Sequence, residues 1–109
     1  MAITGLHPVA CKDIQGGLDI SGSQCFLSTL QQDDLLKAVQ DALEPVGQTL
    51  GWTNDYSVWG AFYTAARNRQ LSFGANVAQI AGDQTLEGSP LTKGYSSMVN
   101  FVVDAEHTP

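Results

Sequence analysis

The segment YSVWGAFYTAARNRQ, residues 56–70, decides the fold predicted for this chain. Apolar residues recur in it at the spacing that places them on one face of a helix. They are Val58, Trp59, Phe62, Ala65 and Ala66. Asn54 or Asp55 precedes the segment as a helix cap, and arginines close it where the helix dipole favours cations. The segment therefore predicts a helix.

Aromatic residues are concentrated in and just before this predicted helix. The chain has two Trp, three Tyr and four Phe, and five of these fall within residues 52–63. One helix cannot bury all five against a core of this size, so we expect a core role for Trp59 and Phe62 and a contact surface beside it. Trp and Tyr are enriched at protein interfaces. The predicted interface consists of Trp52, Tyr56, Trp59 and Tyr63.

A first helix is predicted before this segment. Its apolar stripe has alternating steps of three and four residues and consists of Leu36, Val39, Leu43, Val46 and Leu50. Ser28 and Gln31 have the spacing of a capping box. Pro45 should end the helix near Glu44, leaving a short continuation to Gly51.

The stretch DIQGGLDI, residues 13–20, predicts a β-hairpin whose two-residue turn is Gly-Gly. With that turn, Cys25 would face Pro8 and Cys11 would face Gly22. The two cysteines then point to opposite faces of the hairpin, which disfavours a disulfide between them. We expect two free thiols, and an irregular hairpin leaves the pairing open.

Two strands are predicted after the helices, in LSFGANV (71–77) and SSMVNFVVD (96–104). The residues between them, 81–94, have the composition of a loop. The predicted fold is α+β: an antiparallel sheet, made of the N-terminal hairpin and the C-terminal strands, covered on one face by two helices. At 109 residues we expect a single domain, residues 1–109.

The charge balance disfavours two classes of partner. Five Lys and Arg stand against eleven Asp and Glu, so the net charge is −6. Phosphate binding depends on basic side chains, so we expect no nucleic-acid partner and no anionic membrane partner. The sequence contains no signal peptide and no transmembrane segment, so we expect a cytoplasmic or virion protein.

No catalytic, cofactor-binding or metal-binding residues are predicted. His7, Cys11, Cys25 and His107 lack the short spacings with which one local structure presents two metal ligands. The chain has no nucleophile-elbow motif and no phosphate-binding glycine loop. We therefore expect a protein that is not an enzyme and holds no cofactor.

Low charge, at 15% of residues, and many small polar residues make the composition similar to that of small phage structural proteins. This resemblance implies a non-enzymatic structural or assembly protein in a virion. It would act by protein–protein contact with itself, as a homo-oligomer, or with a larger array, through the aromatic residues and the loop 82–94. Two alternatives stay open: a small α+β enzyme or ligand-binding protein with an aromatic-lined pocket, and an acidic inhibitor of a basic partner.

Overall fold

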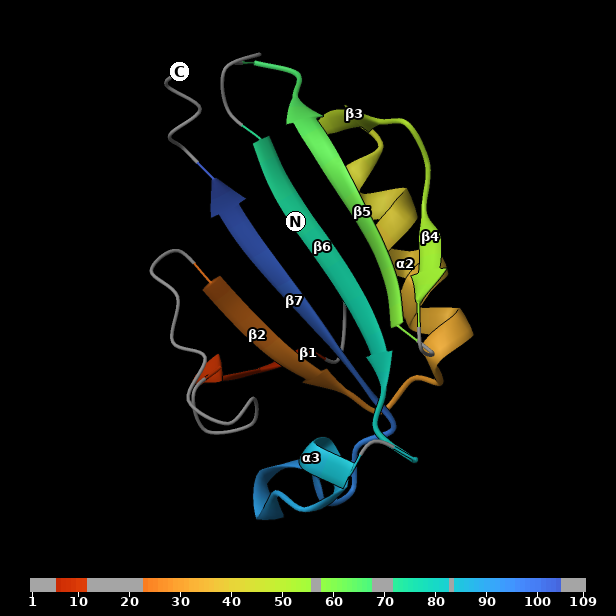
Figure 1. Ribbon diagram of the computed structural model, residues 1–109, viewed down its shortest axis with the longest axis vertical. Helices are drawn as coiled ribbons and strands as arrows, with labels where there is room; N and C mark the ends of the chain where they lie inside the picture. The colour runs from red at the N-terminus through yellow and green to blue at the C-terminus, as the bar shows by residue number, and fades with distance from the viewer. Residues whose placement is uncertain (1–5, 12–22, 56–57, 68–71, 83, 105–109) are drawn as a thin grey trace.

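The structure, a computed structural model, describes residues 6–11, 23–55, 58–67, 72–82 and 84–104 (Figure 1). The strands are β1 (Leu6–Val9), β2 (Ser23–Ser28), β3 (Gly47–Thr49), β4 (Thr53–Asp55), β5 (Val58–Ala65), β6 (Ser72–Gln79) and β7 (Ser97–Asp104). The helices are α2 (Gln32–Leu43), the single-turn α3 (Gln84–Glu87) and the 3-10 helix η1 (Pro90–Thr92).

One antiparallel sheet dominates the fold. Its strand order is β1-β2-β7-β6-β5-β3, and β4 pairs with β5 beside β3. Helix α2 lies across one face of this sheet, behind β5 in Figure 1, and α3 lies at one end. The predicted antiparallel sheet and the strands β6 and β7 are confirmed, so the fold is α+β with one helix of several turns in the described residues.

The predicted second helix is wrong, because its residues form β4 and β5. Strand β5 reads VWGAFYTA, in which β-branched and aromatic residues favour a strand and Gly60 disfavours a helix. Burial alternates along its second half: Ala61, Tyr63 and Ala65 are buried, and the residues between them are exposed. Because the small alanines fill the buried positions, this period of two is weak in a hydrophobicity pattern.

Helix α2 is confirmed with a changed start and a changed apolar face. Ser28 ends β2 and accepts a hydrogen bond from the Leu30 backbone, so the capping box with Gln31 is wrong. The helix ends at Leu43, as the following proline predicts. The fully buried face consists of Leu35, Val39 and Leu43. The continuation to residue 51 is wrong, since β3 occupies it.

The N-terminal antiparallel pairing is confirmed, but its register differs from the prediction by one residue. Val9, not Pro8, faces Cys25. A shift of one residue reverses the face of every side chain in the strand, and β1 ends at Val9, so the alternation used for the prediction does not extend to Cys11. Cys11 and Cys25 form a disulfide with a Cα–Cα distance of 5.3 Å, and the expectation of free thiols is wrong. The predicted glycine turn lies outside the described residues.

The two faces of the sheet carry separate hydrophobic clusters. Under α2 the buried cluster consists of Leu35, Val39, Leu43, Ala61, Tyr63, Ala75, Val77, Val99 and Phe101. The cluster on the opposite face consists of Cys11, Cys25, Leu27, Ala78, Ile80, Leu86 and Met98. Strand β7 therefore contributes apolar side chains to both faces.

The segment 81–94 is not only a loop, because it contains α3 and η1 and packs on the sheet. Leu86 of α3 is buried in the second cluster. The Thr92 hydroxyl, also buried, donates a 2.6 Å hydrogen bond to the Leu86 backbone carbonyl. This segment covers one end of the face opposite α2 and leaves the other end open.

Candidate functional site

Three of the predicted aromatic residues meet on the face covered by α2. The indole Nε1 of Trp52 donates a 2.9 Å hydrogen bond to the Tyr63 hydroxyl. The Tyr63 ring stacks on Phe73, with ring centroids 5.3 Å apart and planes 6° apart. Tyr63 is only 4% exposed, and Trp59 packs against the same core. These contacts give the aromatic residues a place in the core.

The predicted interface residues therefore do not form one surface patch. Tyr63 is buried, Trp52 and Trp59 are half-buried, and Tyr56 lies outside the described residues. We do not retain Tyr63 in a contact surface, because its side chain does not reach solvent in the isolated chain.

The two most exposed large apolar residues among those described lie elsewhere, at the open end of the opposite sheet face. Phe62 in the middle of β5 is 82% exposed, and Leu50 between β3 and β4 is fully exposed. Fully solvated aromatic and leucine side chains close together are typical of interaction sites. Phe62 was predicted to be a core residue, and that prediction is wrong.

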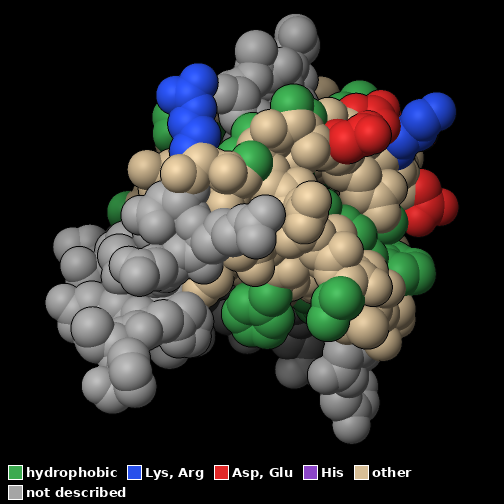
Figure 2. Space-filling model, turned by 90° about the horizontal axis from the view of Figure 1, so that it is seen from above, with side chains coloured by type: hydrophobic (Ala, Val, Ile, Leu, Met, Phe, Trp, Pro, Cys, Tyr) green, Lys and Arg blue, Asp and Glu red, His purple; other side chains and the backbone are tan. Residues whose placement is uncertain are grey.

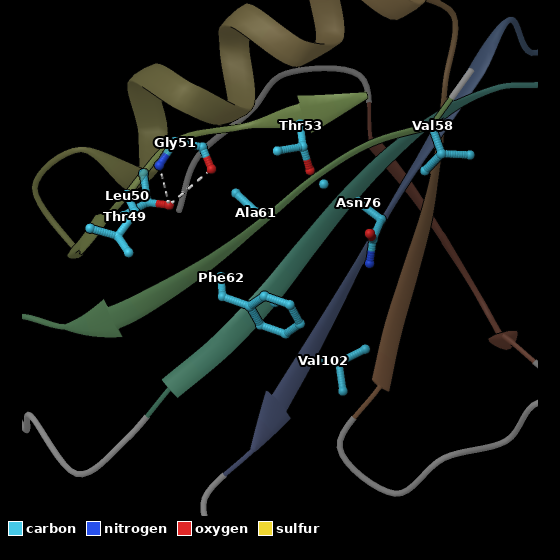
Figure 3. Close-up of a pocket in the computed structure, with 11 residues that line it drawn as sticks. Thr49, Leu50, Gly51, Thr53, Val58, Ala61, Phe62, Asn76 and Val102 are labelled. Atoms are coloured by element: carbon cyan, nitrogen blue, oxygen red, sulfur yellow. Dashed lines mark hydrogen bonds between the residues drawn. The ribbon is translucent and has the colours of Figure 1, made fainter. Parts of the chain in front are cut away.

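A hollow lies beside Phe62, and we call it the open groove (Figure 3). Six residues used below define it: Leu50, Gly60, Phe62, Gly74, Asn76 and Val102. Its volume is about 650 Å³, and a neighbouring hollow of about 790 Å³ continues past Phe62 and Val102. Figure 3 shows Phe62 and Val102 projecting from neighbouring parts of the same sheet face, with Asn76 further along it.

Strand register explains why this part of the sheet is hollow. Gly74 faces Phe62 across β5 and β6, and Gly60 faces Asn76 in the next row. A Cβ on Gly74 would lie 3.4 Å from Cε1 of the Phe62 ring, so the ring rests over the glycine backbone. The glycines contribute no side chains of their own, so the hollow is bounded by the Phe62 ring over Gly74 and by the Asn76 side chain beside Gly60.

The open groove is apolar and uncharged. None of its described lining residues is acidic, basic or a histidine. Exposed charges are concentrated on α2, which carries Asp33, Asp34, Asp41 and Glu44 with Lys37. Among the coloured side chains of Figure 2, seen from above, the acidic and basic ones lie in its upper half, and hydrophobic ones occur in both halves. The face covered by α2 therefore has a charged helix over it, whereas the described lining of the open groove on the other face carries no charge.

A polar row separates the open groove from the covered end of the same face. Asn100 of β7 faces Asn76 of β6 and Cys25 of β2. Its Oδ1 atom is buried and has no hydrogen-bond partner among the described residues. A buried amide oxygen without a donor costs free energy, so this row marks a polar position beside an otherwise apolar surface.

The histidine and cysteine side chains of the described residues make other contacts. They contain no group of three His, Cys, Asp or Glu side chains that could hold a metal ion. His7 stacks on Tyr95 at 5.7 Å between ring centroids, and Cys11 and Cys25 are bonded to each other. His107 lies outside the described residues. None of the helices in the described ranges has the length and hydropathy to span a bilayer.

Comparison of the chain with models of protein families, with curated proteins and with solved structures finds no match. The open groove is therefore interpreted from its own residues.

Sequence reasoning missed this site because it assigned Phe62 to a helix face beside Trp59. A signal for it is present in the sequence. In a strand, Gly60, Phe62 and Thr64 share one face, and the opposite face carries the aromatic and small core residues. Reading the segment with a period of two separates Phe62 from the core residues at once.

Proposed function

We propose that this protein is a non-enzymatic structural or assembly protein that acts through protein–protein contact at the open groove. One observation carries the proposal: Phe62 and Leu50, both large and apolar, are almost completely exposed at a groove whose described lining is uncharged. Burying such side chains against another protein removes apolar surface from water, which favours association.

Composition and the disulfide agree with a role in a larger particle. The chain is low in charged residues, as in small phage structural proteins, and we propose a virion as the larger array. Disulfides persist at virion surfaces and in other oxidising environments and are rare in the cytosol. The Cys11–Cys25 bond therefore favours the virion over the cytoplasm among the two places considered.

A second candidate function is the binding of a small neutral ligand in the open groove. The volume of about 650 Å³ favours it, since it falls in the range of small-molecule sites. Such a ligand would be uncharged and largely apolar, because the groove offers an aromatic ring, aliphatic groups, one amide and two threonine side chains.

Light scattering and a thermal-shift screen together separate the two candidates. For an assembly protein we expect the absolute mass to rise with concentration, in the presence or absence of reductant. We also expect no small neutral compound to raise the melting temperature, because the partner's side chains would already occupy the groove. A protein that stays monomeric and is stabilised by a small compound would contradict the assembly role and support ligand binding.

A further inference from the structure

Resting on the proposed function, we propose that the partner at the open groove is a second copy of this chain, packed sheet to sheet about a two-fold axis. In a two-fold interface the same patch serves both subunits, so the patch must be complementary to itself. The open groove meets this requirement, as the next three observations show.

The first observation is shape. The same patch carries the exposed Phe62 ring and, beside it, the hollow that Leu50, Asn76 and Val102 help to line. The hollow of about 650 Å³ is larger than a phenylalanine side chain. When two such faces are related by a two-fold rotation, Phe62 of each copy enters the hollow of the other. Two aromatic side chains are then buried at the centre of the contact, where binding free energy is concentrated.

The second observation is charge. Each copy carries −6, so two copies repel unless they meet on a surface without acidic residues. The described residues of the open groove are uncharged, whereas α2 on the opposite face has four exposed acids and one lysine. Packing through the groove places the acidic helices on the two outer sides of the dimer.

The third observation concerns the edges of the sheet, the other route by which two β-proteins join. Strand β1 forms one edge and contains Pro8, which has no N–H to donate to an added strand. At the other edge, β3 and β4 have three residues each. Short or proline-containing edge strands resist strand addition. Face-to-face packing, as in a β-sandwich, is the favoured contact.

Sedimentation of the full chain from micromolar to millimolar concentration tests this proposal, with Phe62→Ala and Leu91→Ala as matched variants. Leu91 is a large apolar residue that is 44% exposed on η1, away from the open groove. We expect a dimer in the wild type and in Leu91→Ala. In Phe62→Ala we expect the dissociation constant to rise about tenfold or more. Thermal unfolding at a dilution where each protein is a monomer checks that both variants fold.

The dependence of the dimer dissociation constant on salt concentration provides an independent test. Because two copies of charge −6 repel, added NaCl should screen the repulsion and tighten the dimer. A dimer held by opposite charges would weaken instead, and that result would overturn the proposal.

Three outcomes distinguish this inference from the proposed function. A wild-type dimer that Phe62→Ala breaks and Leu91→Ala keeps supports both. A dimer or larger assembly that survives Phe62→Ala overturns the inference, while the assembly function stands through another surface. A wild-type monomer at every concentration overturns the second copy as partner, and the proposed function then requires a different protein.

Discussion

Two neighbouring residues of one strand have opposite environments. Tyr63 is 4% exposed under α2, where it accepts a hydrogen bond from Trp52 and stacks on Phe73, whereas Phe62 is 82% exposed on the other face. Both are aromatic, and alternation along β5 alone separates them. The face covered by α2 packs against the helix, and the open end of the other face leaves apolar side chains exposed to solvent.

This contrast separates the effects of substitutions on stability from their effects on association. A residue under α2 loses packing contacts when it is shortened, so the free energy of unfolding falls. A residue in the open groove is already in water, so the same substitution changes the folded monomer little. The following predictions are arranged from the largest expected change in stability to the smallest.

The largest effect is expected on the helix that covers the core. Leu35→Ala removes a side chain that is fully buried against the sheet. We expect the free energy of unfolding to fall by about 3 kcal/mol, because lost burial and the cavity left behind both contribute. Urea unfolding followed by circular dichroism measures it.

Leu50→Ala is the matched control, since it makes the same chemical change at a fully exposed leucine. We expect its unfolding free energy to stay within about 0.5 kcal/mol of the wild type. Equal losses in the two variants would show that the two faces do not differ as described.

The covered end of the face opposite α2 depends on the disulfide. Replacing Cys11 and Cys25 together by serine opens a loop with a sequence separation of 14. We expect a loss of about 3 kcal/mol, because the unfolded chain gains conformational entropy. Urea unfolding of both proteins with and without reductant measures it.

In reductant, the wild type should lose stability toward the level of the double variant, which itself should not respond. A wild type that is insensitive to reductant would contradict a stabilising disulfide.

The elements that could be predicted from the sequence are those whose local pattern and tertiary environment agree. Strands β6 and β7 and the helix ending before Pro45 follow from local periodicity and from proline chemistry. Strand β5 could not be predicted in this way, because VWGAFYTA fits both a helical face and a strand. Pairing with β4, which has only three residues, and with β6, which comes later in the chain, decides between helix and strand.

The predictions for the disulfide and for the exposed site were wrong for related reasons. A register error of one residue between β1 and β2 was enough to place Cys11 and Cys25 on opposite faces. Placing Phe62 on a helix put it with the core residues. The aromatic cluster was recognised as the distinctive feature, but which of its members are exposed depends on strand alternation and on where α2 lies.

Glycines on the two faces provide a further test. Gly47 of β3 is buried, and a Cβ there would lie 2.6 Å from the backbone oxygen of Thr64. We expect Gly47→Ala to lower the free energy of unfolding by about 1 to 3 kcal/mol, because a strand backbone must move to admit the methyl group. Urea unfolding measures it, and a loss below 0.5 kcal/mol, the usual scatter of neutral surface changes, would contradict this close packing.

The smallest effect on stability is expected for Gly74→Ala in the open groove. The added Cβ would lie 3.4 Å from Cε1 of the exposed Phe62 ring, which can shift by the few tenths of an ångström required. Alanine also loses less conformational entropy than glycine when a strand forms, so we expect a change within about 0.5 kcal/mol in urea unfolding. The methyl group nevertheless displaces the Phe62 ring that would enter the partner's hollow, so sedimentation should show a weaker dimer. Dimerisation equal to that of the wild type would place the contact away from Gly74, even if Phe62 takes part in it.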